Sequence, residues 1–460
     1  MPHTAVPAAE LAARLENLRR AMSAAHPDWG MILLDSKIDL YYFTGTMQEG
    51  ALVITPDEAA LFVRHSYECA VRDSNFADIR PLGSFRGIAS AFPHIPETVY
   101  VATRTMTLQK LAMLQKYLPF APASIDSILS GLHAVKSAYE LECMRHAGKI
   151  HAKVLETVAP ALLRPGLSEA RLCSEICTSM LDHGAMGISR FNQPAAEDVL
   201  GLASYSENGL MPTALDSPSG TVGTCIAMKS IGSTERLLRG GDTVLLDIPC
   251  GWRGYHTDKS ITFYFGDLDE NPKADLIRAA HEQCIALEKM TAELLRPGAV
   301  PAEIYEKILA AVDPAFRDGF MNSCKFLGHS IGLTMDEAPV LAKGFNRSYP
   351  SCRLRSSRKS RSKALASSAR KTPMKLRKTA PQNRLPATAR PVSKSITDTN
   401  TTRRLSFYPQ PSFTSQPIST RLLPFPSYSR CEIETTVRPP AAERSAARTQ
   451  CSYCARMIPM

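Results

Sequence analysis

Long apolar runs are missing from this sequence. No segment approaches the roughly 18 consecutive apolar residues that a membrane-spanning helix requires. Residues 1–22 alternate Ala and Leu with Glu and Arg, so they also lack the apolar centre of a secretion signal. Both absences argue against a membrane or secreted protein and favour a cytoplasmic one.

Paired cysteine motifs are scarce as well. The 12 cysteines are scattered, and the single C-x-x-C pair, Cys451 and Cys454, has no second Cys or His pair to complete a zinc site. Cys173 and Cys177 lie four residues apart in a predicted helix. We interpret them as two small buried hydrophobic side chains rather than as metal ligands. We therefore expect free thiols, as in a reducing cytoplasm.

Acidic residues are nearly absent from the last quarter of the chain. Residues 346–460 hold 23 of the 54 Lys and Arg but only 4 of the 44 Asp and Glu, a net charge of +19. Residues 1–345 therefore carry 31 basic and 40 acidic residues, a net charge of −9. Sparse hydrophobic residues without a sustained period predict that the segment 346–460 is disordered.

The first part of the chain alternates helical and extended patterns. Leu11, Leu15, Leu18 and Met22 follow helical spacing. Later segments predict further elements, with strands at 31–34, 38–43, 51–55, 60–63 and 99–102 and a helix at 108–117. We expect a small α/β domain over residues 1–133.

Residues 134–345 predict a second domain. Ser168 can cap a helix that continues to Leu181. Helices are expected at 140–158, 168–181, 273–295 and 301–312, and strands around 224–227, 243–248, 260–265 and 325–327. Helices and short strands are thus expected side by side in this domain.

Two aspartates stand eleven positions apart beside apolar strand patterns. Asp247 ends the run Val244-Leu245-Leu246, and Gly251-Trp252-Arg253-Gly254 supplies a turn before Asp258. Antiparallel strands would bring both carboxylates together, where they repel each other unless a hard divalent cation lies between them. The spacing by itself is weak, because ordinary turn or surface aspartates also produce it.

His329 lies between two glycines, in Gly328-His329-Ser330-Ile331-Gly332, after the strand-like segment 325–327. A lone histidine is more often structural than catalytic. Glycines around it nevertheless indicate a tight approach of backbone at this histidine.

Three segments, taken in order, resemble the M24-type metallopeptidase family of methionine aminopeptidase, prolidase and Xaa-Pro aminopeptidase. They are G-D-T-V-L-L-D-I at 241–248, Y-H-T-D-K-S-I-T-F at 255–263 and G-H-S-I-G-L-T-M-D-E-A-P-V-L at 328–341. The segment V-K-S-x-x-E-L-x-x-M-R-x-A at 135–147, with the domain before it, resembles the Xaa-Pro aminopeptidase, prolidase and creatinase branch. The resemblance extends from about residue 10 to residue 345.

The resemblance implies an α+β catalytic domain of the pita-bread fold that hydrolyses N-terminal bonds of peptides or dipeptides. Two divalent ions, of manganese, cobalt, zinc or iron, would be held by two Asp, one His and two Glu. Asp247 would chelate one ion, Asp258 would bridge both, and His329 would bind the second. Glu337 would orient this region as a catalytic residue, although a helix-start or surface carboxylate fits equally well. Relatives of this kind often form homodimers.

The sequence departs from the family pattern on the substrate side. Asp336 stands nearest the position where relatives carry a second His, and Thr213 follows Asn208-Gly209-Leu210-Met211-Pro212 where another His is expected. These changes put specificity for Xaa-Pro bonds in doubt.

The two Glu ligands are also missing. After Phe345 there is no Glu-Pro motif and no Glu-Asn-Thr motif, and the tail has only four acids, Asp398, Glu432, Glu434 and Glu443. Permitted codons for residues 369–380, read from each third base, can spell Ala-Glu-Asn-Thr-Tyr-Glu-Ile-Thr-Glu-Asn-Gly. We therefore interpret residues 346–460 as the product of a frameshift near residues 346–350.

Three functions compete on this sequence. The first is a metal-dependent aminopeptidase or dipeptidase whose activity is impaired by the altered C-terminus. The second is a non-catalytic pita-bread binding protein with a basic arm for nucleic acid, which the few aromatic residues of the tail disfavour. The third is creatinase-like C–N hydrolysis without metal, which the retained Asp pair does not favour.

Overall fold

The computed structural model describes residues 5–192, 200–211, 218–318 and 320–348. Within these ranges, no helix is both long and apolar enough to cross a membrane. The tail predicted to be disordered lies almost wholly outside the described residues, as does Thr213.

The N-terminal domain is a six-stranded sheet with helices on both faces. Its strands have the order β4-β3-β2-β1-β5-β6, and only β2 runs antiparallel to its neighbours. The strands are β1 (Ile32–Leu34), β2 (Gly50–Ile54), β3 (Ala59–Val63), β4 (Ile79–Pro81), β5 (Thr98–Val101) and β6 (Ala121–Ser124). The helices are α1 (Ala8–Ala25), α2 (Lys37–Thr44), α3 (Tyr67–Asp73), α4 (Arg86–Ala91), α5 (Leu108–Gln115) and α6 (Asp126–His133).

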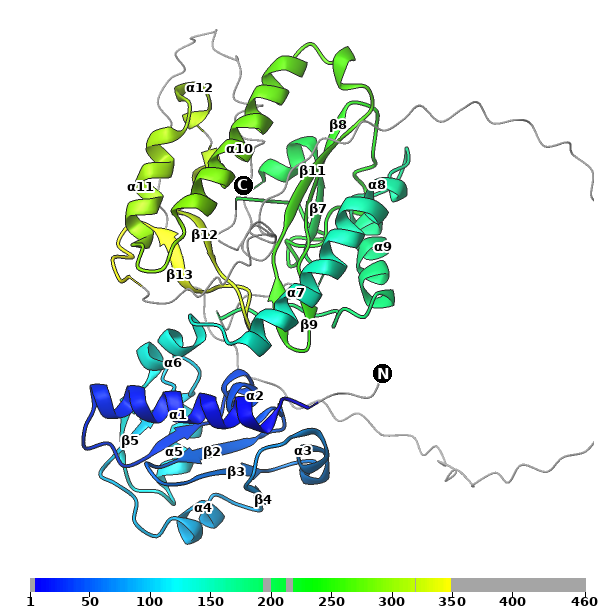
Figure 1. Cartoon of the computed structure of the whole chain (residues 1–460). Coiled ribbons are helices and arrows are strands. Elements are labelled where there is room, and N and C mark those ends of the chain that lie inside the picture. The colour runs from blue at the N-terminus through cyan, green and yellow to red at the C-terminus, as the bar shows by residue number, and fades with distance from the viewer. Residues whose placement is uncertain (1–4, 193–199, 212–217, 319, 349–460) are drawn as a thin grey trace, which may run out of the picture. The chain divides into compact units, whose positions relative to one another are not determined.

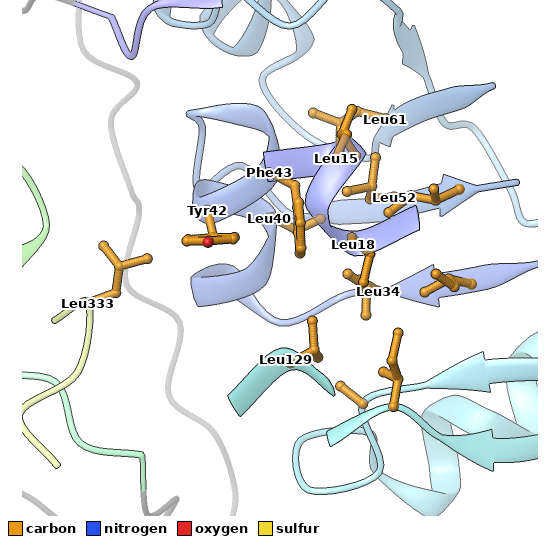
Figure 2. Close-up of a cluster of buried hydrophobic side chains, with 14 of the residues drawn as sticks. Leu15, Leu18, Leu34, Leu40, Tyr42, Phe43, Leu52, Leu61, Leu129 and Leu333 are labelled. Atoms are coloured by element: carbon orange, nitrogen blue, oxygen red, sulfur yellow. The ribbon is translucent and has the colours of Figure 1, made fainter. Parts of the chain in front are cut away.

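Alternate residues of the central strands enter two separate cores. Leu34 and Leu52 pack with Leu15 and Leu18 of α1 on one face (Figure 2). Leu33, with Val53 and Val101 of the adjacent strands, packs in the core on the opposite face. Successive side chains in a strand point to opposite faces, so the continuous apolar runs of the sequence fill both cores.

The strand predicted at residues 38–43 is wrong, because this segment forms helix α2. Ser36 accepts a hydrogen bond from the Asp39 backbone N–H at the start of the helix, at 3.1 Å. Gly45 ends it with a φ of 76°, in the left-handed region that glycine favours. The two caps determined this element more strongly than its β-forming side chains did.

The second domain begins with a long helix that changes its winding. Helix α7 (Ala138–Lys153) continues through the π-helical turn η1 (Val154–Val158) into α8 (Ala159–Leu162), and α9 (Glu169–Asp182) follows. Ser168 caps α9 as predicted, accepting from the Arg171 N–H. These helices and the sheet β11-β8-β7 enclose one hydrophobic core (Figure 1).

The remaining elements of this domain are short strands and two larger helices. The strands are β7 (Leu202–Tyr205), β8 (Asp242–Asp247), β9 (Cys250–Trp252), β10 (Tyr255–Thr257), β11 (Ser260–Phe265), β12 (Phe326–Ser330) and β13 (Glu337–Ala342). The helices are α10 (Ala274–Leu294), α11 (Pro301–Ala311) and α12 (Pro314–Arg317), with short 3₁₀ turns η2 (Ser206–Leu210), η3 (Leu268–Glu270) and η4 (Phe320–Ser323). The run 224–227, predicted to be extended, makes only an isolated bridge between Cys225 and Met228. The α+β organisation expected for this part is confirmed.

Candidate metal centre

Asp247 and Asp258 lie on either side of a break between two strand ladders. In the first ladder β8 pairs with β11, and its last pair is Asp247 with Ser260. In the second, β9 pairs with β10, starting at Cys250 with Thr257. Asp258 therefore lies in the connection between the two ladders, close in the chain to the end of each. The predicted hairpin is confirmed, with its turn at Arg253 and Gly254, whose φ values are 51° and 84°.

Asp247 is held by its cross-strand neighbour. The Ser260 hydroxyl donates to its Oδ1 over 2.8 Å. This bond restricts the orientation of the carboxylate through Oδ1, and Oδ2 makes no bond to Ser260.

His329 faces Asp258 from another sheet. Its Nε2 lies 3.7 Å from Asp258 Oδ2, and the side chains are 19% and 23% exposed. His329 Nδ1 lies 3.2 Å from the Ser330 carbonyl oxygen, which can only accept, so Nδ1 donates there. In the neutral ring, Nε2 then presents a lone pair towards a carboxylate oxygen. Two acceptors that face each other across such a gap suit an intervening cation.

The donor types fit a divalent ion, because carboxylate oxygen and imidazole nitrogen are common ligands of manganese, zinc and iron. Within the described ranges, no group of three or more His, Cys, Asp or Glu side chains converges to hold a metal. The structure thus brings Asp258 and His329 together, with Asp247 on the neighbouring strand end.

Glu337 is buried in an ion pair. Its Oε2 lies 2.6 Å from Lys136 Nζ, and its Oε1 accepts from the Thr334 N–H over 3.1 Å. Burial is the largest influence and raises the pKa of Glu337, but the charges of Lys136 and His133, together with the hydrogen bonds from Lys136 and Thr334, outweigh it and keep the pKa below its usual value. A Cβ at Gly332 would come within 2.4 Å of this carboxylate. Through these contacts Glu337 stabilises the turn after His329. A catalytic role for Glu337 stays a prediction.

Asp336 also makes a structural contact. Its Oδ1 accepts from the Asn192 N–H over 2.5 Å, and the Met335 N–H donates to the Arg190 carbonyl over 2.7 Å. Burial raises the pKa of Asp336. The residue that replaces the expected histidine therefore anchors the segment 190–192 beside the site.

His256 is a further residue of this region, which the sequence analysis passed over within Y-H-T-D. It is fully buried. Its Nδ1 lies 3.1 Å from the Gly332 carbonyl, and its Nε2 accepts from the Arg190 N–H over 3.2 Å. Burial lowers its pKa to about 4, so the ring is neutral at neutral pH. The sequence offered one indication of its importance, its position two residues before Asp258. Its hydrogen-bond partners could not be predicted, because they lie 66 and 76 residues away in the chain.

Two family profiles match this chain in order. The creatinase/prolidase N-terminal domain matches residues 14–135, and metallopeptidase family M24 matches residues 142–359. The second match covers the segments that carry Asp247, Asp258 and His329.

Individual relatives are distant. The chain is 27% identical to an ectoine hydrolase of Halomonas elongata over 226 residues, covering 48% of this chain and 49% of that protein. It is 26% identical to methionine aminopeptidase A of Synechocystis over 205 residues, covering 45% of this chain and 70% of the relative. The chain thus spans about half the length of the first of these relatives.

Solved structures show the same fold. The Xaa-Pro dipeptidase of Bacillus anthracis superposes with a TM-score of 0.60 at 18% identity, covering 74% of this chain and 86% of that structure. One solved structure thus matches 74% of this chain in a single superposition. The protein belongs to metallopeptidase family M24, in the branch that combines a creatinase/prolidase N-terminal domain with a pita-bread catalytic domain.

Proposed function

We propose that the chain is a metal-dependent aminopeptidase or dipeptidase of the Xaa-Pro aminopeptidase type, impaired in this product by the loss of two Glu ligands. The observation that carries the proposal is the approach of Asp258 Oδ2 to His329 Nε2, at 3.7 Å, beside the strand end that holds Asp247. Family membership supplies the expected chemistry, since M24 proteins are metallopeptidases.

Asp247, Asp258 and His329 would hold the divalent ions, with Asp258 between the two. Such ions, when bound, activate a water molecule and stabilise the charge that develops on the scissile carbonyl. The chain's own residues supply the positioning. Ser260 restrains Asp247, and His256 and Glu337 restrain the turn after His329.

Loss of two anionic ligands weakens such a site severely, because the charge and number of ligands set affinity for hard cations. The three remaining ligands form a carboxylate-poor set. We therefore expect weak metal binding and little hydrolysis. Xaa-Pro preference should also be reduced, because Asp336 is already bonded to the Asn192 backbone.

A frame-restored variant tests this proposal. It keeps residues 1–345 and continues in the reading frame that spells Glu-Asn-Thr. With Mn²⁺ and a panel of Ala-Pro, Met-Ala and ectoine, the frame-restored variant should hydrolyse at least one of the two dipeptides, and hydrolysis of ectoine alone would contradict the peptidase assignment. Ectoine is included because one relative is an ectoine hydrolase. The present chain should show less than about one-hundredth of that rate, in line with the losses caused by removing groups that act on the transition state.

The matched control is Asp258→Asn in the frame-restored variant, which should abolish hydrolysis. Equal rates for the present and frame-restored chains would contradict impairment. No hydrolysis by either chain would contradict the peptidase assignment.

The charge of +19 over residues 346–460 supports a second candidate, a non-catalytic protein with a basic arm for nucleic acid. A shift of DNA or RNA at low salt that weakens with added salt, and disappears when 346–460 are removed, would support it. No shift at low salt would exclude it.

A further inference from the structure

The connection that contains Asp258 lacks the support of a strand ladder. The β8–β11 ladder ends at Asp247 and Ser260, and the β9–β10 ladder begins at Cys250 and Thr257. Residues 248–249 and 258–259 lie between the two ladders; we call these four residues the joint. Something other than ladder hydrogen bonds must keep its two strands at a fixed separation.

His151 of α7 contacts both sides of this joint. Its Nε2 lies 2.7 Å from the Ile248 carbonyl oxygen, and its Nδ1 lies 2.9 Å from Thr257 Oγ1. Ile248 directly follows Asp247, and Thr257 directly precedes Asp258. One ring therefore links the immediate neighbours of both aspartates.

The hydrogen-bond roles in this bridge are determined by its partners. A carbonyl oxygen only accepts, so His151 Nε2 carries a proton and donates it to Ile248. In the neutral ring Nδ1 is then the acceptor. The Thr257 hydroxyl also lies 3.3 Å from the Cys250 carbonyl oxygen, but it donates to Nδ1 over the shorter distance of 2.9 Å. His151 is 1% exposed, and burial lowers its pKa to about 3, so the neutral form persists at neutral pH. A neutral ring with one donor and one acceptor satisfies both strands at once.

A second contact reaches the joint from the same helix. Glu156 lies in the π-helical turn η1 and pairs with Lys259, which directly follows Asp258. Single π-helical turns inside α-helices are frequent at functional sites. Here the turn follows His151 by three residues, so one helix contacts the joint at two points.

We propose that His151 is a positioning residue that holds the Asp247 and Asp258 carboxylates at a fixed separation by bridging Ile248 and Thr257. The inference rests on the proposed function in one respect, namely that both aspartates bind metal. The bridge makes no contact with a metal ligand side chain, so its role is indirect. Residues that orient ligands in this way typically change metal affinity by 10- to 100-fold when replaced.

Hydrogen exchange of the full chain in EDTA tests the bridge without needing metal or activity. His151→Leu removes both hydrogen bonds while keeping an apolar side chain in the buried site. We expect exchange of the amides in 248–259 to accelerate at least about ten-fold, with rates in β1 to β3 unchanged within about two-fold. His151→Gln, whose amide can still donate to Ile248, should give an intermediate rate and provides a milder variant if His151→Leu does not fold.

Leu33→Ala, in the core on the other face of the N-terminal sheet, is the matched control for general loss of stability, and it should leave exchange in 248–259 unchanged. Unchanged exchange rates of the amides in 248–259 in both His151 variants would overturn the proposal. An equal acceleration of exchange in every region of the chain would overturn it as well. Rescue by His151→Gln relative to His151→Leu would support it.

Mn²⁺ binding, followed by electron paramagnetic resonance, separates this inference from the proposed function. His151→Leu should weaken Mn²⁺ binding about ten-fold, and Leu33→Ala should not. If the frame-restored variant, which carries the two Glu ligands, also binds no Mn²⁺, the assignment of Asp247 and Asp258 as ligands fails. The exchange rates then still decide whether His151 holds the joint.

Discussion

The N-terminal domain and the region around the candidate metal centre are stabilised in different ways. The N-terminal sheet has six strands with an apolar core on each face. The candidate centre lies among sheets of two or three strands, linked by buried polar contacts of His151, His256 and Glu337. Apolar packing is tolerant of sequence, whereas a buried polar contact depends on a particular partner. The first kind of region maintains the fold, and the second fixes the separations that chemistry requires.

The largest effect on the free energy of unfolding is expected from Lys136→Met, which removes one partner of a buried polar contact near the candidate centre. The substitution leaves the Glu337 carboxylate buried without its ion-pair partner. Breaking one partner of a buried pair typically costs about 3–5 kcal/mol in the free energy of unfolding. Urea unfolding would measure this loss. Adding Glu337→Gln to Lys136→Met should recover much of it, and a lack of recovery would contradict a specific pair.

Leu33→Ala tests the apolar side. Leu33 is fully buried in the core on the other face of the sheet from that of Figure 2, so the free energy of unfolding should fall by about 2–5 kcal/mol. The distinguishing point is locality, because hydrogen exchange in 248–259 should not change. If exchange there rises as much as in β1 and β2, the two regions are not stabilised independently.

An intermediate effect is expected from acid. The pKa of His151 is near 3 in the folded state against an ordinary value of 6.5, so below pH 6.5 the unfolded chain binds a proton that the folded chain does not. The stability contributed by the neutral ring is complete above pH 6.5 and is lost as pH falls towards 3. This loss amounts to about 1.4 kcal/mol per pH unit.

Buried carboxylates act in the opposite sense, because burial raises the pKa of Asp39, Glu140 and Glu169. The measurement is therefore a difference between the unsubstituted chain and His151→Gln, with unfolding free energies taken from pH 7.5 to 5. The His151→Gln curve should be flatter. Parallel curves would show that His151 titrates normally.

The smallest effect is expected at the surface. Glu175 pairs with Arg164 and Arg171, which are 52% and 68% exposed. Glu175→Gln should lower the free energy of unfolding by about 1 kcal/mol or less, and the loss should shrink in 1 M salt. A loss as large as that of Lys136→Met would remove the contrast between surface and buried pairs.

The sequence predicted much of the fold because local patterns carried it. Helical spacing located α1, α10 and α11, and Ser168 marked the start of α9. It failed at residues 38–43, where apolar and aromatic side chains favour a strand but the caps at Ser36 and Gly45 produce a helix.

The site was only partly predictable. Motif order identified Asp247, Asp258 and His329, and the structure brings Asp258 and His329 together. His151 carried no signal of its own, because its partners lie 97 and 106 residues further along the chain. A buried bridge of this kind depends on tertiary contacts that no local pattern encodes.

Metal content tests the central claim most directly. Purified chain would be incubated with Mn²⁺, dialysed against metal-free buffer and analysed for bound metal, with Ala-Pro hydrolysis measured in parallel. An impaired site with three of five ligands predicts fewer than two ions per chain, readily lost on dialysis, and no appreciable hydrolysis. Two tightly bound ions per chain, together with dipeptide hydrolysis, would contradict it.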